Sequence, residues 1–280
     1  MPIHFIELLK IIFLGIVEGV TEWLPISSTG HMLLVDEFLR IEMSEAFKEM
    51  FFVVIQLGAI LAVVTTFFRK MWPFRMKDKK PTVEKDTMLL WVKVVIACIP
   101  GAVITLLFDD VIEKHLHRPV VIAAALIFYG IAFILIELWN KNRAVQTEKV
   151  TDITFFTALM IGLFQVLSIV PGTSRSGATI VGALLIGVSR VAAAEFSFFL
   201  AVPVMFGWSA LKLMKFGFDF TGAEIITLLV GMLVAFVVSL LVIKFLMNYI
   251  KKHDFKLFGW YRIALGVIVI LYFILSGKWI

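Results

Sequence analysis

Glu18-Gly-Val-Thr-Glu22-Trp-Leu-Pro-Ile-Ser-Ser28-Thr-Gly-His31 is a polar stretch in an otherwise apolar chain, and the architecture follows from it. A second stretch resembles it: Gln165-Val-Leu-Ser-Ile-Val-Pro171-Gly-Thr-Ser-Arg175-Ser-Gly177. Each holds a proline and a glycine, the residues at which a helix breaks. Because ionisable groups are costly inside apolar segments, both stretches need partners or a water-filled cavity.

The rest of the chain has the composition of a membrane protein. Of its 280 residues, 61% are hydrophobic and 17% are charged. A membrane-spanning helix needs about 20 apolar residues. Six stretches qualify, at residues 49–69, 87–108, 119–139, 191–215, 222–247 and 257–276. The net charge of +5 comes from cations that lie beside these spans, so we expect no nucleic-acid partner.

Two further apolar regions, 3–40 and 152–190, are interrupted midway by the polar stretches. We expect each to form a helix pair that enters the membrane and returns on the same side. Lipid offers no hydrogen bonds to exposed backbone, so such a break must be buried in protein or line a wet cavity. The two breaks therefore predict a shared cavity.

Basic residues indicate the orientation. Seven lie between Arg69 and Asp86, and the connections after the third and fifth spans are also rich in lysine and arginine. This side is predicted to be cytoplasmic, which places both termini outside. The first broken pair then enters from outside and the second from the cytoplasm.

The two halves, 1–140 and 150–280, resemble one another. At a spacing of 147 residues the matches are Gly15 with Gly162, Glu18 with Gln165 and Gly30 with Gly177, and at a spacing of 146 they are Pro25 with Pro171 and Ser28 with Ser174. An odd number of crossings in each half turns the second copy upside down. The predicted fold is a single membrane domain, 1–280: an all-α polytopic protein with six transmembrane helices and two re-entrant helix pairs in an inverted-topology repeat.

Glu18 and Glu22 lie four residues apart and share one helix face. Two such carboxylates do not both ionise comfortably. Either one acts as an acid or base, or an arginine or a divalent cation neutralises the pair. Mg²⁺ suits this arrangement, with Ca²⁺ as the alternative, because one or two carboxylates, waters and phosphate oxygens complete its shell.

Hydroxyls and an imidazole follow directly. Ser28 is a candidate nucleophile, with His31 or one of the glutamates as its base. His31 as nucleophile, or direct attack by water, stays open. Ser27 and Thr29 either contact substrate phosphate oxygens or cap the returning helix.

The second stretch presents hydroxyls and a guanidinium ahead of an apolar helix. Thr173, Ser174, Arg175 and Ser176 suit an anion at a helix N-terminus. Arg175 can grip phosphate with two parallel hydrogen bonds. The alternative partners of its guanidinium are Glu18, Glu22 and Glu195. Supporting roles are predicted for Gln56, Gln165 and Glu195.

These residues resemble the undecaprenyl-diphosphate phosphatase family, bacterial membrane proteins also associated with bacitracin resistance. Besides the two polar stretches, the similarity covers Val54-Ile-Gln-Leu-Gly-Ala-Ile-Leu61, Glu195-Phe-Ser-Phe-Phe-Leu-Ala-Val-Pro203 and Trp260-Tyr-Arg-Ile263. The resemblance implies hydrolysis of undecaprenyl diphosphate to the monophosphate carrier of peptidoglycan synthesis. It also implies a divalent cation and a site that opens outward from the bacterial plasma membrane, and it leaves a homodimer open.

The resemblance implies residue roles as well. Glu18, Glu22, Ser28 and His31 correspond to the catalytic group, and Ser174, Arg175 and Thr179 to the residues that bind the diphosphate. One departure is Phe52, where the family often has an acidic residue, and Glu49 one turn away is the candidate substitute.

A secondary transporter or lipid flippase is the alternative function. Inverted repeats with discontinuous helices are typical of transporters. In that case the two glutamates carry protons or a cation and Arg175 holds an anionic substrate. Release of phosphate by purified protein in detergent distinguishes hydrolysis from transport.

Overall fold

The computed structural model describes residues 4–77, 80–116 and 118–277. Its α-helices are α1 (Phe5–Thr21), α2 (Ser28–Phe38), α3 (Glu45–Val54), α4 (Gln56–Thr66), α5 (Phe68–Met71), α6 (Lys85–Leu116), α7 (Pro119–Asn140), α8 (Phe155–Val166), α9 (Arg175–Leu185), α10 (Arg190–Phe216), α11 (Gly222–Ile250) and α12 (Lys256–Leu275). Two 3-10 turns, η1 (Val150–Asp152) and η2 (Leu167–Ile169), flank α8. Strands β1 (Phe74–Lys77) and β2 (Lys80–Val83) form an antiparallel hairpin.

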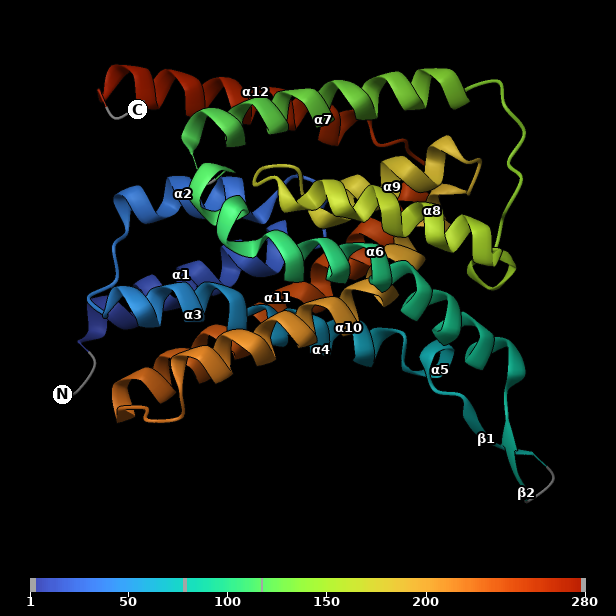
Figure 1. Cartoon of the computed structure of the whole chain (residues 1–280), viewed down its shortest axis with the longest axis horizontal. Coiled ribbons are helices and arrows are strands. Elements are labelled where there is room, and N and C mark those ends of the chain that lie inside the picture. The colour runs from blue at the N-terminus through green and yellow to red at the C-terminus, as the bar shows by residue number, and fades with distance from the viewer. Residues whose placement is uncertain (1–3, 78–79, 117, 278–280) are drawn as a thin grey trace.

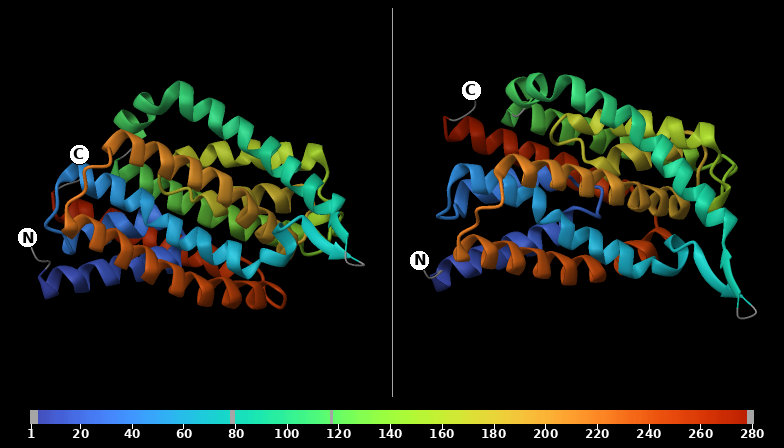
Figure 2. Two further views of the ribbon diagram at one scale, coloured as in Figure 1. Left: turned by 90° about the horizontal axis from the view of Figure 1, so that it is seen from below. Right: turned by 60° about the horizontal axis from the view of Figure 1, so that its bottom comes forward.

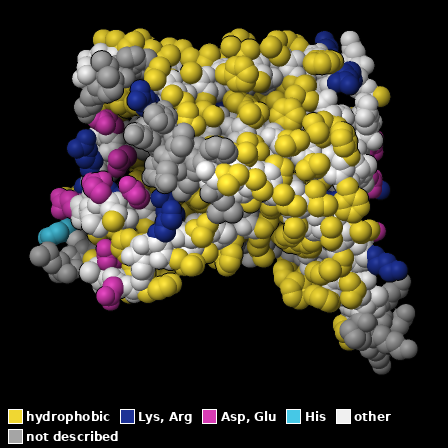
Figure 3. Space-filling view, in the orientation of Figure 1, with side chains coloured by type: hydrophobic (Ala, Val, Ile, Leu, Met, Phe, Trp, Pro, Cys, Tyr) yellow, Lys and Arg dark blue, Asp and Glu magenta, His cyan; other side chains and the backbone are white. Residues whose placement is uncertain are grey.

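The six predicted spans are confirmed within the described residues. Helices long and apolar enough to cross a membrane cover Glu45–Thr66, Lys85–Thr105, Pro119–Asn140, Arg190–Phe216, Gly222–Ile250 and Lys256–Leu275. On the face in Figure 3, hydrophobic side chains cover the middle of the molecule and charged ones lie toward its two ends. The chain is therefore a helical multi-pass membrane protein.

Both predicted breaks are present. α1 is separated from α2 by a turn around Pro25, and α8 from α9 by a turn around Pro171. In Figure 1 the first pair lies toward the end that holds both chain termini, and the second pair lies toward the opposite end, which bears the hairpin. Figure 2 shows the termini and the hairpin at opposite ends from two further directions.

Each broken helix packs against a long helix from the other half of the chain. α1 lies on α11, and α8 lies on α6. Glycines allow this close approach, as is common between membrane helices. A Cβ at Gly15 would lie 2.9 Å from Val234 Cβ, and a Cβ at Gly162 would lie 2.3 Å from the Ala97 carbonyl oxygen. The two glycines that match in the sequence thus make matching contacts.

Two features are absent from the sequence-based prediction. The connection after the first span contains the β1–β2 hairpin. Its strands have four residues each and include Pro81 and two lysines, which is a pattern typical of a loop. The first span is also divided at Ile55 into α3 and α4. Pro100 and Pro203, in contrast, lie inside the continuous helices α6 and α10.

Candidate active site

The two polar turns meet through Glu22 and the start of α9. Arg175 Nη2 donates to Glu22 Oε1 at 3.2 Å, and Ser176 Oγ donates to the Glu22 carbonyl oxygen at 3.4 Å. Among the partners considered from sequence for Arg175, Glu22 is the one it contacts. Both side chains are largely buried, with 11% and 8% exposed. The polar centre therefore combines residues from both halves of the chain.

The turns end in the same helix cap. Ser27 and Ser174 have positive φ angles, 74° and 71°, and each side chain accepts a hydrogen bond from the backbone N–H three residues later. The expected capping role of Ser27 is thus present. These equivalent caps show that the turns match at a spacing of 147, so the pairing of Ser28 with Ser174 is wrong and Ser28 corresponds to Arg175. Helices α2 and α9 both begin at these turns, and the N-terminus of a helix favours anions.

Ser28 pairs with a glutamate. Its Oγ donates to Glu22 Oε2 at 3.0 Å. Of the bases considered from sequence, Glu22 is thus the one in hydrogen-bonding contact with this hydroxyl. Since Glu22 Oε1 accepts from Arg175, one carboxylate joins the candidate nucleophile to the guanidinium.

Both ring nitrogens of His31 have partners. Nδ1 lies 2.7 Å from the Ser27 carbonyl oxygen, and Nε2 lies 2.7 Å from the Tyr261 hydroxyl. Because a carbonyl only accepts, Nδ1 carries the proton, and in the neutral ring Nε2 accepts from Tyr261. The two rings are also stacked, with centroids 5.6 Å apart. His31 is held in place at the edge of the centre.

Arg262 connects the two turns by hydrogen bonds to their backbone carbonyls. This fully buried residue on α12 donates from Nη1 to the Pro25 carbonyl at 3.2 Å and from Nη2 to the carbonyls of Gly172 and Thr173 at 2.7 and 2.8 Å. The sequence-based prediction missed both Arg262 and Tyr261. The signal was available, because an ionisable residue inside an apolar span indicates function by default.

Two side-chain oxygens near the turns are buried without a hydrogen-bond partner among the described residues. They are Glu18 Oε1 and Gln165 Oε1, which match at the spacing of 147. Buried polar atoms normally have partners, so the Glu18 carboxylate is suited to a bound cation. No group of three or more His, Cys, Asp or Glu side chains that could hold a metal occurs in the described part of the chain. Glu18 and Glu22 are the two carboxylates beside the turns that could contribute ligands to a cation, and water and phosphate oxygens would have to supply the others.

The remaining hydroxyls differ in exposure. Thr173, Ser176 and Thr179 are buried, whereas Thr29 is exposed. The Thr179 hydroxyl lies 3.0 Å from the Arg175 carbonyl and 2.8 Å from Ser197 Oγ. Arg175 Nη1 also donates to the Ser197 carbonyl at 2.8 Å, while its Nε is buried and has no partner among the described residues. Thr179 thus contacts the backbone of Arg175 and the side chain of Ser197, and the Arg175 guanidinium keeps one buried donor, Nε, without a partner among the described residues.

Other predicted residues lie elsewhere. Glu195 pairs with Lys70 at 2.6 Å instead of facing Arg175. Gln56 is half-buried at the start of α4. Phe52 packs in an apolar cluster beside Phe51, and Glu49 is exposed on α3.

Known proteins resemble the chain over nearly its whole length. Residues 11–268 match the family described as bacitracin resistance protein BacA. A relative from Enterococcus faecalis named undecaprenyl-diphosphatase is 69% identical over 97% of this chain and 99% of its own. Relatives with the same name from Lachnoclostridium phytofermentans and Desulfitobacterium hafniense are 63% and 61% identical, over 97% and 96% of this chain and 99% and 96% of their own. The chain belongs to the BacA family of bacitracin resistance proteins.

Proposed function

We propose that the chain hydrolyses undecaprenyl diphosphate to undecaprenyl phosphate and phosphate, which returns the lipid carrier to peptidoglycan synthesis and confers bacitracin resistance. The observation that carries this proposal is the chain of contacts from Ser28 through Glu22 to Arg175, at 3.0 and 3.2 Å. It unites a hydroxyl, a proton acceptor and an anion clamp at two helix N-termini. The name shared by the closely similar relatives supports the same reaction.

In the proposed reaction, Ser28 Oγ attacks the terminal phosphorus and Glu22 takes the hydroxyl proton. The bond from phosphorus to the bridging oxygen breaks, and the lipid monophosphate leaves with that electron pair. Arg175 stabilises negative charge on the transferring phosphoryl oxygens. Water then cleaves the phosphoserine, which releases phosphate and restores the hydroxyl. Ser174 and the N-terminus of α9 orient the diphosphate.

A divalent cation, Mg²⁺ or alternatively Ca²⁺, would be held by Glu18 and Glu22. When bound, it supplies a Lewis acid that offsets the charge of the phosphate oxygens. The partnerless Glu18 Oε1 supports this assignment. Glu22 retains lone pairs for the cation beyond its contacts with Ser28 and Arg175.

The same proposal includes an inverted-topology repeat of halves 1–140 and 150–280, with α1–α2 and α8–α9 as re-entrant pairs. The exchanged pairing of α1 with α11 and α8 with α6 supports it. The lysine- and arginine-rich hairpin end is assigned to the cytoplasm. The site is proposed to open toward the other, outer side of the bacterial plasma membrane.

Purified protein in detergent is expected to release phosphate from a polyprenyl diphosphate. Release should stop on addition of a chelator and return with Mg²⁺, because the paired carboxylates are then neutralised again. A colorimetric phosphate assay measures both. Transport without hydrolysis predicts no phosphate in this single compartment, so a silent assay with folded protein contradicts the proposal.

Ser28→Ala is expected to lower turnover by about 10³-fold or more, as loss of a nucleophile does in other hydrolases. Ser276→Ala removes a hydroxyl near the end of α12 and serves as the matched control. Acid-quenched reactions with labelled substrate should also lose the phosphoenzyme in Ser28→Ala. A variant that keeps normal turnover would assign the attack to water or His31.

A further inference from the structure

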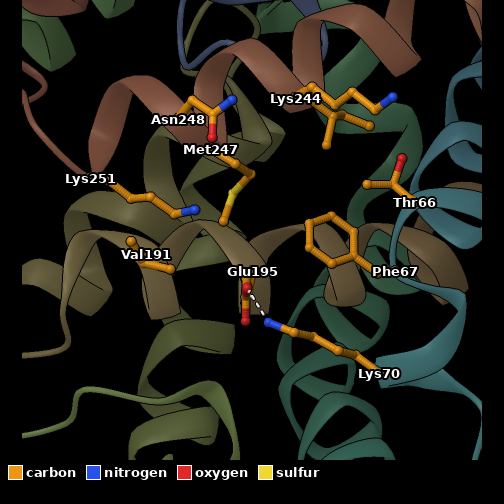
Figure 4. A pocket seen from close by; sticks show the side chains of 10 residues that line it. Thr66, Phe67, Lys70, Val191, Glu195, Lys244, Met247, Asn248 and Lys251 are labelled. Atoms are coloured by element: carbon orange, nitrogen blue, oxygen red, sulfur yellow. Dashed lines mark hydrogen bonds and ion pairs between the residues drawn. The ribbon is translucent and has the colours of Figure 1, made fainter.

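A cavity lies apart from the two turns, among α4, α5, α10 and α11. Its volume is about 380 Å³, which is within the range of small-ligand sites. Figure 4 shows it between Thr66 and Phe67 on one side and the side chains of α11 on the other. The residues that form the proposed active site do not line it.

The charge of this cavity is positive. Lys70, Lys244 and Lys251 line it together with one carboxylate, Glu195. Lys70 is paired with Glu195 at 2.6 Å, whereas Lys244 and Lys251 have no ion pair with a described residue. In Figure 4, Lys251 extends into the cavity beside Met247, and Lys244 lies on the other side of the cavity, near Thr66. Asn248, between them on α11, adds an amide donor. The surplus of donors suits an anion.

A neighbouring cavity of the same protein differs from the first in the charge of its lining residues. It has a similar volume, about 380 Å³, and shares Lys70, Val191 and Glu195 with the first. Its other charged lining residues, however, are mainly acidic: Glu84, Asp86 and Glu148 against Arg75 and Lys149. The Lys70–Glu195 pair therefore separates a cation-rich cavity from an acid-rich one, and an anion is expected only in the first.

We propose that the cation-rich cavity binds a phosphate-bearing anion, the headgroup of an anionic lipid or free phosphate. Lys251 directly follows the apolar span Gly222–Ile250, which places it at headgroup level. Leu241 and Phe245 lie on the same helix as Lys244 and are 67% and 56% exposed, so they can contact acyl chains. Basic pockets between membrane helices bind anionic headgroups in this way. Val191, which lines the cavity, lies in the first turn of α10, so the positive N-terminal end of this long helix lies at the cavity wall.

The test measures thermal unfolding of the detergent-solubilised full chain. Phosphatidylglycerol, phosphatidylcholine and inorganic phosphate are titrated separately into the wild type, Lys244→Gln/Lys251→Gln and a control. The control, Lys141→Gln/Lys252→Gln, changes the net charge equally at exposed lysines outside the cavity. The phosphate titration is repeated in the Arg175→Ala chain, so that binding at the proposed active site does not contribute.

Phosphatidylglycerol is expected to stabilise the wild type and the control at about tenfold lower concentration than the cavity variant, with no such difference for phosphatidylcholine. The same difference with inorganic phosphate alone identifies free phosphate as the ligand. Equal responses of all three proteins to both anions overturn the proposal. Because no turnover is measured, this result is independent of the proposed function.

Glu195→Gln provides a change in the opposite direction. It frees Lys70 from its ion pair and removes the one carboxylate in the cavity, so the affinity for the same anion should rise by several fold. A loss of affinity in this variant would show that the Lys70–Glu195 ion pair maintains the shape of the cavity and that the positive charge of the cavity does not select the anion. That result would contradict the proposal.

Discussion

Arg175→Ala should lower phosphate release by about 10³-fold or more while the protein still folds. Arginines that stabilise a transferring phosphoryl group contribute this much in other phosphoryl-transfer enzymes. The guanidinium is held by Glu22 and by the Ser197 carbonyl, and its Nε has no partner among the described residues. Its position is thus set before substrate arrives, so substitution removes an oriented donor.

Two variants make this prediction specific. Arg175→Lys keeps the charge but not the planar fork, and it should recover only a small part of the lost rate. Arg143→Ala removes an exposed arginine in the connection after α7 and should retain wild-type rates. Initial rates, together with gel filtration and thermal unfolding, measure all three. Wild-type turnover in folded Arg175→Ala would refute the assigned role.

Arg262→Met should lower kcat by about 10²-fold without a comparable change in KM. Arg262 is a positioning residue, because it donates hydrogen bonds to carbonyls of both turns and so holds the turns together. Without it, these buried carbonyls lose their donor, at a cost of about 1–3 kcal/mol each, and the turns separate. A displacement of about 1 Å between reacting groups is enough for such a loss.

The matched control is Arg190→Met. Arg190 is another arginine with buried partner atoms, but its partner is the Glu137 carboxylate, and this pair lies at the start of α10, away from the turns. Both variants should unfold at lower temperature, and only Arg262→Met should lose kcat. Arg262→Lys should restore part of the rate, since one amine can still donate to these carbonyls. An equal loss of kcat in both methionine variants would mean that lower stability, and not positioning, explains the effect.

Much of the fold follows from composition. The six spans and the two breaks at Pro25 and Pro171 are confirmed, because apolar length and helix-breaking residues act locally along the chain. The meeting of Glu22 with Arg175 was among the open alternatives and is present. Burial of charge makes such a pairing predictable in kind, although several glutamates were equally available.

Side-chain partners were harder to predict. The contact of Ser28 with Glu22, and of His31 with Tyr261, depends on the direction in which each turn leaves its helix. The register of the repeat was misjudged at Ser174, because adjacent serines at positions 27 and 28 align equally well. Arg262 was missed although it is an ionisable residue inside an apolar span, and the sequence does not indicate that its partners are backbone carbonyls of both turns.

The lengths of α2 and α9 indicate how far below the membrane surface the two polar turns lie in the proposed re-entrant arrangement. Each has 11 residues, or about 16 Å at the helical rise, which is about half of a hydrocarbon layer of about 30 Å. In the proposed re-entrant arrangement, a diphosphate held at their N-termini would lie deeper than the headgroup layer, where the helix N–H groups would take the place of water. The same arrangement predicts that the prenyl chain leaves the site sideways, between helices. Only its first isoprene units meet the protein, so the reaction should depend little on total chain length.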